Sequence, residues 1–171
     1  MDVAAFQMPV DQINNIMTNH QHWRDMGLVE SGETYMVGSD LTLKNESRFL
    51  IEDPSGYLAQ IKNLGMEQNL LCEIEKSVSV ISRQKVDTTA SQMALKGQTA
   101  SLVIKDYQNI SVLSAFKPLA IKDVDWAILS EIDEAEAFAA TQNAQYYFNF
   151  CRTDHCRHRR CDRYIFAASD F

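Results

Sequence analysis

The chain has 171 residues, of which 46% are hydrophobic and 23% are charged, and its formal net charge is -7 at pH 7. This length and composition fit one globular domain, or one domain with a tail, and exclude a multidomain machine and a disordered or collagen-like chain. The acidic balance argues against a general nucleic-acid-binding protein, because such a protein needs a surplus of Lys and Arg to neutralise phosphates.

The charge is distributed unevenly along the chain. Residues 1–140 carry 11 basic and 20 acidic side chains, a net charge of -9, whereas residues 141–171 have a net charge of +2 and contain Arg but no Lys. No apolar run approaches the roughly 18 to 20 residues that span a bilayer, and the first residues lack the basic and apolar regions of a signal peptide. We therefore expect residues 1–140 to form a soluble domain and residues 141–171 to form an atypical tail.

The first predicted element is a long helix over about residues 9–26. Pro9 can occupy a first helical turn, and apolar side chains follow at spacings of three and four residues. His20 falls on the same stripe, so we expect it to pack against the rest of the domain. Gly27 is expected to end the helix.

The rest of the body contains hairpin, helix and strand patterns. We expect a hairpin over 34–43, helices over 54–61 and 88–95, and strands over 99–105, 110–116 and 126–132. Residues 70–82 have a weak apolar pattern that does not decide between helix and strand. Residues 106–109 are expected to form a tight turn between the first two late strands.

These elements together predict an α+β fold. The three late strands have short connections and predict an antiparallel meander, which the hairpin extends to a sheet of about five strands with helices on one face. Residues 133–140 combine strong helix formers with acids at their start, so a C-terminal helix is expected to leave the sheet there.

Several short motifs occur in a characteristic order. They are Pro9-Val10-Asp11-Gln12-Ile13-Asn14, Gly32-Glu33-Thr34-Tyr35-Met36-Val37-Gly38, Ser47-Arg48-Phe49-Leu50, Asp106-Tyr107, Val112-Leu113-Ser114-Ala115 and Glu131-Ile132-Asp133. As an ordered set they resemble the Cache family, the PAS-like extracytoplasmic sensor domains of bacterial receptors, over about residues 9–139. The likeness is strongest to the membrane-proximal sensor module of adenylate or guanylate cyclases, chemoreceptors and sensor kinases.

The resemblance implies a long N-terminal helix, a curved antiparallel sheet with a small-ligand pocket on one face, and an output helix that continues toward the membrane. It further implies a periplasmic or extracellular domain of an inner-membrane protein, a homodimer, and a ligand such as an amino acid or a carboxylate. The family often has Asp-Tyr-Arg-Gly where this chain has Asp106-Tyr107-Gln108-Asn109. A ligand contact made by that arginine in the family is therefore not expected in this chain.

A ligand pocket of this kind needs a cation, an acid and aromatic walls. The candidate residues are Arg48, Tyr35, Asp106, Tyr107, Phe116 and Ser114. Arg48 could bind a ligand carboxylate or form a structural ion pair with a loop acid, and Asp106 could instead bond the backbone amides of its turn. For Tyr35 and Phe116, a place in the core is favoured over a place in the pocket wall. Ser114 could face either way.

No catalytic pattern can be read in residues 1–140. They contain no Ser-His-Asp or Cys-His arrangement, no glycine-rich phosphate loop and no regular metal spacing of the acids. We therefore expect no enzymatic activity and no cofactor. The expected mechanism is that of a sensor, in which ligand binding shifts the C-terminal helix between two states. One alternative is a module that dimerises and relays signals without a ligand.

The other alternative is a metal- or nucleic-acid-binding protein that acts through the tail. The tail contains the possible metal ligands Cys151, His155, Cys156, His158 and Cys161. Zinc binds sulfur and nitrogen in tetrahedral sites, but the Cys-x4-Cys-x4-Cys spacing lacks the usual paired knuckles, and the five arginines of the tail oppose a cation. The arginines form only a short patch for nucleic acid. A third interpretation is that residues from about 141 onward come from a shifted reading frame.

Overall fold

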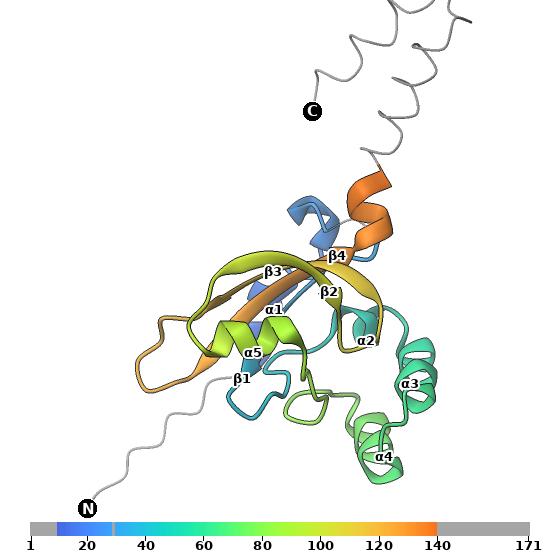
Figure 1. Cartoon of the computed structure of the whole chain (residues 1–171). Coiled ribbons are helices and arrows are strands. Elements are labelled where there is room, and N and C mark those ends of the chain that lie inside the picture. The colour runs from blue at the N-terminus through green and yellow to red at the C-terminus, as the bar shows by residue number, and fades with distance from the viewer. Residues whose placement is uncertain (1–9, 29, 140–171) are drawn as a thin grey trace, which may run out of the picture. The chain divides into compact units, whose positions relative to one another are not determined.

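The structure is a computed structural model that describes residues 10–28 and 30–139. These residues form an α+β fold with a four-stranded antiparallel sheet (Figure 1). The chain divides into two compact units between Glu134 and Ala135, so the whole sheet and every helix before residue 134 belong to one unit. The predicted α+β class is confirmed.

The sheet is built from β1 (Glu33–Gly38), β2 (Ala100–Lys105), β3 (Ser111–Pro118) and β4 (Trp126–Asp133). Their order in the sheet is β1-β4-β3-β2, and every neighbouring pair is antiparallel. The three predicted late strands are confirmed, with ends that differ by at most two residues. They form the expected meander, and β1 pairs with the free side of β4.

The predicted second arm of the hairpin, residues 41–43, is not a strand. Leu43 makes an isolated bridge to Val37. Beyond it, the Met36 amide donates to the side chain of Asn45 over 2.7 Å. Because a side-chain oxygen replaces a backbone carbonyl there, the ladder does not continue, and the described sheet has four strands rather than about five.

The helices are α1 (Val10–Met17), the 3-10 helix η1 (Trp23–Met26), α2 (Arg48–Glu52), α3 (Pro54–Asn63), α4 (Gln68–Ser77) and α5 (Thr89–Leu95). The helices predicted over 54–61 and 88–95 are confirmed as α3 and α5. Thr88 and Ser91 cap each other's backbone amides at the start of α5, which fixes where that helix begins. Residues 134–139 are helical, as expected for the start of the C-terminal helix. No helix in the described ranges has the length and apolar character needed to cross a bilayer.

The long helix predicted over residues 9–26 is wrong in its described part. The helix α1 stops well before the predicted end, and residues 19–21 have left-handed backbones with φ of 48°, 54° and 69°. In the last turn, the Thr18 amide and hydroxyl both donate to the Asn14 carbonyl, over 2.9 and 2.8 Å. Left-handed residues cannot continue a right-handed helix. His20, which was expected to pack, is therefore exposed.

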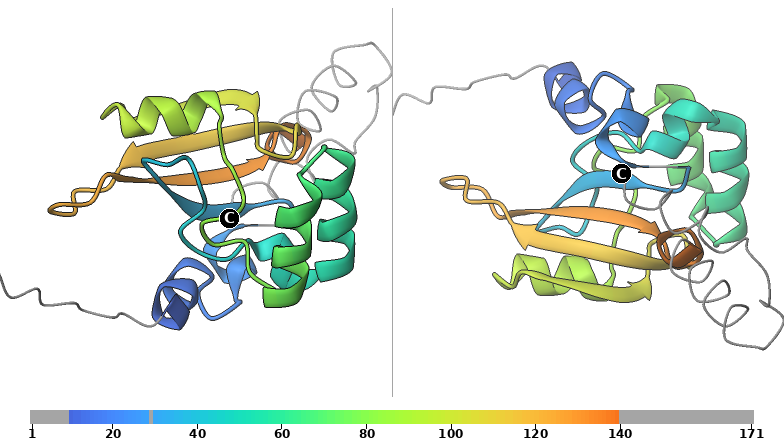
Figure 2. Two further views of the ribbon diagram at one scale, coloured as in Figure 1. Left: turned by 90° about the horizontal axis from the view of Figure 1, so that it is seen from below. Right: turned by 90° about the horizontal axis from the view of Figure 1, so that it is seen from above.

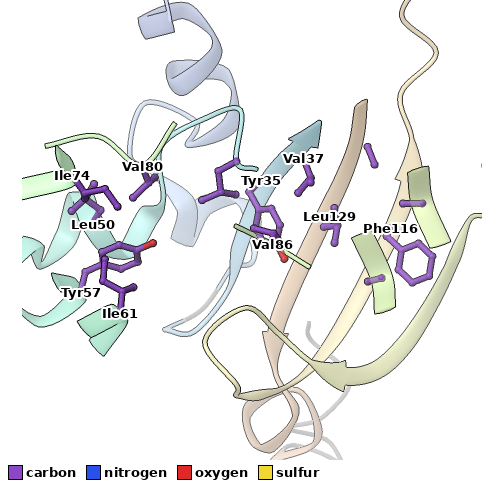
Figure 3. Packing of buried hydrophobic residues seen from close by; sticks show 14 of the residues in the cluster. Tyr35, Val37, Leu50, Tyr57, Ile61, Ile74, Val80, Val86, Phe116 and Leu129 are labelled. Atoms are coloured by element: carbon purple, nitrogen blue, oxygen red, sulfur yellow. The ribbon is translucent and has the colours of Figure 1, made fainter. Parts of the chain in front are cut away.

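The core lies between one face of the sheet and the helices. The helix α5 packs against β2, β3 and β4, while α2, α3 and α4 pack in sequence against one another (Figure 2). Figure 3 shows a group of buried side chains around the helices, Leu50, Tyr57, Ile61, Ile74 and Val80, and a second group on the sheet side, Val37, Val86, Phe116 and Leu129, with Tyr35 between the two groups. Phe116 is thus a core residue, one of the two alternatives that the sequence left open.

Candidate functional site

A row of polar side chains crosses the buried face of the sheet. In the strand register, Glu33 of β1 lies opposite Glu131 of β4, and Glu131 lies opposite Ser114 of β3. Their exposed fractions are only 3%, 4% and 0%. We call these three residues the polar row. The next residue across the sheet, Leu102 of β2, is 37% exposed, so the β2 end of the polar row lies nearest to solvent.

Glu33 is fully hydrogen-bonded. Its Oε1 accepts from the Ser47 hydroxyl over 2.6 Å and from the Arg48 amide over 2.8 Å, and its Oε2 accepts from the Tyr107 hydroxyl over 2.8 Å. Burial raises the pKa of Glu33 to about 7, although these hydrogen bonds act in the opposite direction. Because Ser47 and Arg48 begin α2, this carboxyl group ties that helix to β1.

Glu131 is hydrogen-bonded on one side only. Its Oε2 accepts from the Tyr35 hydroxyl over 2.7 Å, whereas its Oε1 has no hydrogen-bond partner among the described residues. Burial raises the pKa of Glu131. The nearby Ser114 hydroxyl lowers the pKa of Glu131. The two groups do not meet the geometry of a hydrogen bond, so Ser114 Oγ also has no hydrogen-bond partner among the described residues.

Two adjacent polar atoms without partners are unusual in a protein interior. A buried polar group that makes no hydrogen bond costs about 1–3 kcal/mol. Glu131 Oε1 and Ser114 Oγ belong to directly opposed residues on the same face of the sheet. Hydrogen-bond donors from a further chemical group would satisfy both atoms.

Aromatic side chains border the polar row. The rings of Tyr35 and Tyr107 meet edge to face, with centroids 5.7 Å apart and planes at 90°. The Gln108 side-chain amide donates to the Tyr107 hydroxyl over 3.1 Å, so this residue supports the aromatic wall. The structure thus brings together three of the predicted site residues, Tyr35, Tyr107 and Ser114.

Arg48 has a structural role. Its guanidinium group donates to the carbonyl oxygens of Leu28 and Gly32 in the loop before β1, the former over 2.8 Å, and it pairs with Glu52 at 3.2 Å. Its charged carbon lies 5.0 Å from the ring centroid of Trp23. The contacts include a structural ion pair, but the acid belongs to α2 rather than to a loop, and the loop before β1 contributes two backbone carbonyls instead. They occupy the cation that was considered for a ligand carboxylate.

Asp106 stabilises the turn between β2 and β3. Its Oδ1 accepts from the Gln108 amide over 2.9 Å and from the Ile110 amide over 2.7 Å. Burial raises the pKa of Asp106, and the two backbone hydrogen bonds oppose that shift. The structure therefore favours the turn role over direct ligand contact.

We expect Asp106→Ala to lower the free energy of unfolding by about 1–2 kcal/mol, because two amides of the turn lose their acceptor. Asp106→Asn keeps an oxygen acceptor and should lose less than half of that amount. Urea denaturation of the two variants measures the difference. Equal stability of Asp106→Ala and the wild type would contradict the turn role.

Two acids of the polar row, Glu33 and Glu131, were not singled out as site residues from the sequence. The signal that could have found them is strand alternation, since Glu33 is two residues before the buried Tyr35 and Glu131 is two residues after the buried Leu129. In each strand the acid is therefore in phase with the buried side chains.

Other possible sites in the described chain are weaker. The described residues contain no group of three or more His, Cys, Asp or Glu side chains that could hold a metal ion. The tail candidates Cys151, His155, Cys156, His158 and Cys161 lie outside the described residues. A hollow of about 420 Å³ lies on the face of the sheet opposite the polar row, with Ser101, Ala115, Lys117, Ile128 and Ser130 in its lining. It is open, and its charged residue, Lys117, is exposed.

Comparison with known proteins gives no relative on which an assignment could rest. No family model, no curated protein and no solved structure matches the chain. The resemblance to the Cache family stays a prediction from the sequence, and the function is inferred from the chemistry of the polar row.

Proposed function

We propose that the folded domain is a small-molecule sensor of the PAS-like Cache type that belongs to a bacterial transmembrane signalling protein and faces the extracytoplasmic side. The observation that carries the proposal is the pair of unpartnered polar atoms, Glu131 Oε1 and Ser114 Oγ, on the buried face of the sheet. The α+β fold and the aromatic wall of Tyr35 and Tyr107 support it. The row offers hydrogen bonds and charge without an activated nucleophile, which favours binding over catalysis.

The ligand that suits this site is a small organic molecule with an amino group. An ammonium group has three N–H donors, so it can bond Glu131 Oε1 and Ser114 Oγ at the same time. Its positive charge also favours the ionised form of Glu131, which burial otherwise disfavours. A carboxylate ligand fits less well, because the polar row is acidic and Arg48 is engaged by the loop before β1.

The ligand acts through β4. Glu131 lies near the end of this strand, and the helical residues 134–139 follow it directly along the chain. The Asp133 amide donates to the Ser31 hydroxyl over 3.0 Å, and the Ser111 hydroxyl donates to Glu134 over 2.8 Å, so the end of β4 is held by two neighbouring segments. A ligand that binds one position of β4 more tightly than another shifts the helix that follows. The parent protein's membrane-spanning helices would carry the signal onward.

A thermal-shift screen of the full chain tests the proposal, with primary amines, matched carboxylates, neutral analogues and zinc as probes. An amine at about one hundred times its dissociation constant should add about 2.7 kcal/mol of stability, which raises the melting temperature by several degrees. Glu131→Gln should abolish this shift. Glu75→Gln, which changes an exposed acid on α4, should leave it intact.

Each other outcome favours a different function. If no amine shifts the wild type, the sensor proposal fails and the alternative of a signal-relay module without a ligand gains support. A shift by carboxylates that persists in Glu131→Gln would place the ligand site elsewhere. A response to zinc alone, lost when residues 141–171 are deleted, would favour the metal-binding alternative.

A further inference from the structure

The two edges of the sheet differ in how they are covered. Residues 42–44 fold over the outer side of β1, where the Gly38 amide donates to the Thr42 carbonyl over 3.2 Å and the Met36 carbonyl accepts from the Lys44 amide over 2.9 Å. The outer side of β2 has no strand partner among the described residues. An uncovered edge strand is a template for pairing with another strand.

The sequence of β2 does little to prevent such pairing. Its central residues Leu102, Val103 and Ile104 are apolar, and the strand contains no proline, while its one charge, Lys105, stands at the end. Leu102 and Val103 are 37% and 46% exposed. Edge strands that must stay unpaired usually carry proline, a bulge or a central charge.

The backbone of β2 presents its free groups at alternate residues. The Asp106 amide donates to the Ile110 carbonyl over 2.9 Å, which makes these two residues a hydrogen-bonded pair at the end of the β2–β3 ladder. Because such pairs alternate along an antiparallel ladder, Leu102 and Ile104 direct their amides and carbonyls toward β3. Val103, between them, directs its amide and carbonyl away from the sheet.

We propose that β2 pairs antiparallel with β2 of a second copy of this chain, with a two-fold axis at Val103. The two Val103 residues then form a hydrogen-bonded pair, because each has its amide and carbonyl on the outer side. Ser101 and Lys105 also direct their backbone groups outward. Ser101 of one copy pairs with Lys105 of the other copy across the axis. The two sheets join into one continuous sheet, and the interface is self-complementary, as a two-fold dimer requires.

The side chains fit a second copy in this register. Val103 of one copy packs against Val103 of the other on the open face. On the buried face, the half-exposed Leu102 lies against Ile104 of the second copy, so both exposed apolar side chains of β2 are covered. Each Lys105 lies opposite a serine, which keeps the two lysines from facing each other.

Sedimentation equilibrium of the full chain tests the proposal. The wild type should sediment as a dimer, and Val103→Lys should weaken the dimer at least about tenfold, because two like charges meet at the axis. Val103→Pro should have the same effect, because it removes an outward amide but no hydrogen bond to β3. Ile121→Lys is the matched control and should not change the dimer, since Ile121 is 48% exposed but lies outside the sheet.

A cross-link tests the register itself. The Cα atoms of a hydrogen-bonded antiparallel pair are about 5.5 Å apart, which is within the range of a disulfide. Val103→Cys should therefore give a covalent dimer on mild oxidation, with the linked peptide identified by mass spectrometry. A wild type that stays monomeric at its highest soluble concentration would overturn the proposal, and so would a dimer that Val103→Lys leaves unchanged. Circular dichroism checks that each variant is folded. If Val103→Pro does not fold, Val103→Lys alone decides the test.

Discussion

Replacing Arg48 with methionine is expected to lower the free energy of unfolding by about 3–5 kcal/mol. Methionine keeps most of the apolar stem, but the carbonyl oxygens of Leu28 and Gly32 lose a charged donor in the interior. The contact with the Trp23 ring is lost as well. Guanidinium chloride denaturation, analysed with a common slope for both proteins, measures the change.

The control for this prediction is Arg83→Met. Arg83 pairs with Glu73 at 3.6 Å, and the two side chains are 31% and 62% exposed, so this pair is more open to solvent than the pair of Arg48 and Glu52. A surface ion pair of this kind contributes about 0–1 kcal/mol. If both substitutions have equally small effects, Arg48 does not hold the loop before β1, and its guanidinium group becomes available again as a candidate ligand contact.

The stability of the wild type is expected to fall as the pH rises from about 5 to 8. Burial raises the pKa of Glu33 from its ordinary value of 4.5 to about 7, so the folded protein binds this proton more tightly than the unfolded chain does. The stabilisation is complete below about pH 4.5 and is lost as the pH rises through about 7. For a shift of this size the loss amounts to about 3 kcal/mol. Thermal unfolding at several pH values measures it.

Glu33→Gln should remove most of this dependence and should exceed the wild type in stability at pH 8. The glutamine oxygen can still accept from Ser47 and Arg48, and its amide can donate to the Tyr107 hydroxyl. A residual slope of the same sign is expected, because burial also raises the pKa of Glu131 and of Asp106. An unchanged slope in Glu33→Gln would show that Glu33 is ionised in the folded protein throughout this range.

Acids with lowered pKa values act in a separate pH range. Hydrogen bonds lower the pKa of Asp53 and Asp87, and the same is true of Asp40, where hydrogen bonds and Lys44 outweigh desolvation. Their stabilising contribution is lost only when the pH falls below about 4. They therefore do not mask the effect of Glu33 between pH 5 and 8.

The elements with strong local signals could be predicted from the sequence. The helix α5 has a reciprocal cap at Thr88, α3 begins at Pro54, and the late strands are separated by short turns. Each of these signals depends on neighbouring residues only. The turn role of Asp106 could be foreseen for the same reason, because the two backbone amides that donate to its carboxylate lie within four residues.

The parts that could not be predicted depend on backbone conformations or on partners that a local sequence pattern does not reveal. The N-terminal stripe was periodic, but the left-handed residues after Thr18 end α1, and periodicity does not report backbone conformation. The predicted fifth strand does not form, because the Asn45 side chain accepts the hydrogen bond of the Met36 amide in place of a backbone carbonyl. The polar row needs the register of β1 against β4, which single-strand patterns do not contain.

The pairing of β1 with β4 closes the longest loop in the sheet, and the polar row depends on it. Tyr35 and Glu131 are 96 residues apart, whereas Phe116 and Leu129 pair within the meander across a short connection. On the logarithmic dependence of closure entropy on length, the long loop costs about 2 kcal/mol more than the short one. A molecule bound to Glu131 Oε1 and Ser114 Oγ would share the Glu131 carboxylate with Tyr35, so occupancy of the site and the pairing of β1 with β4 would be coupled through that one side chain.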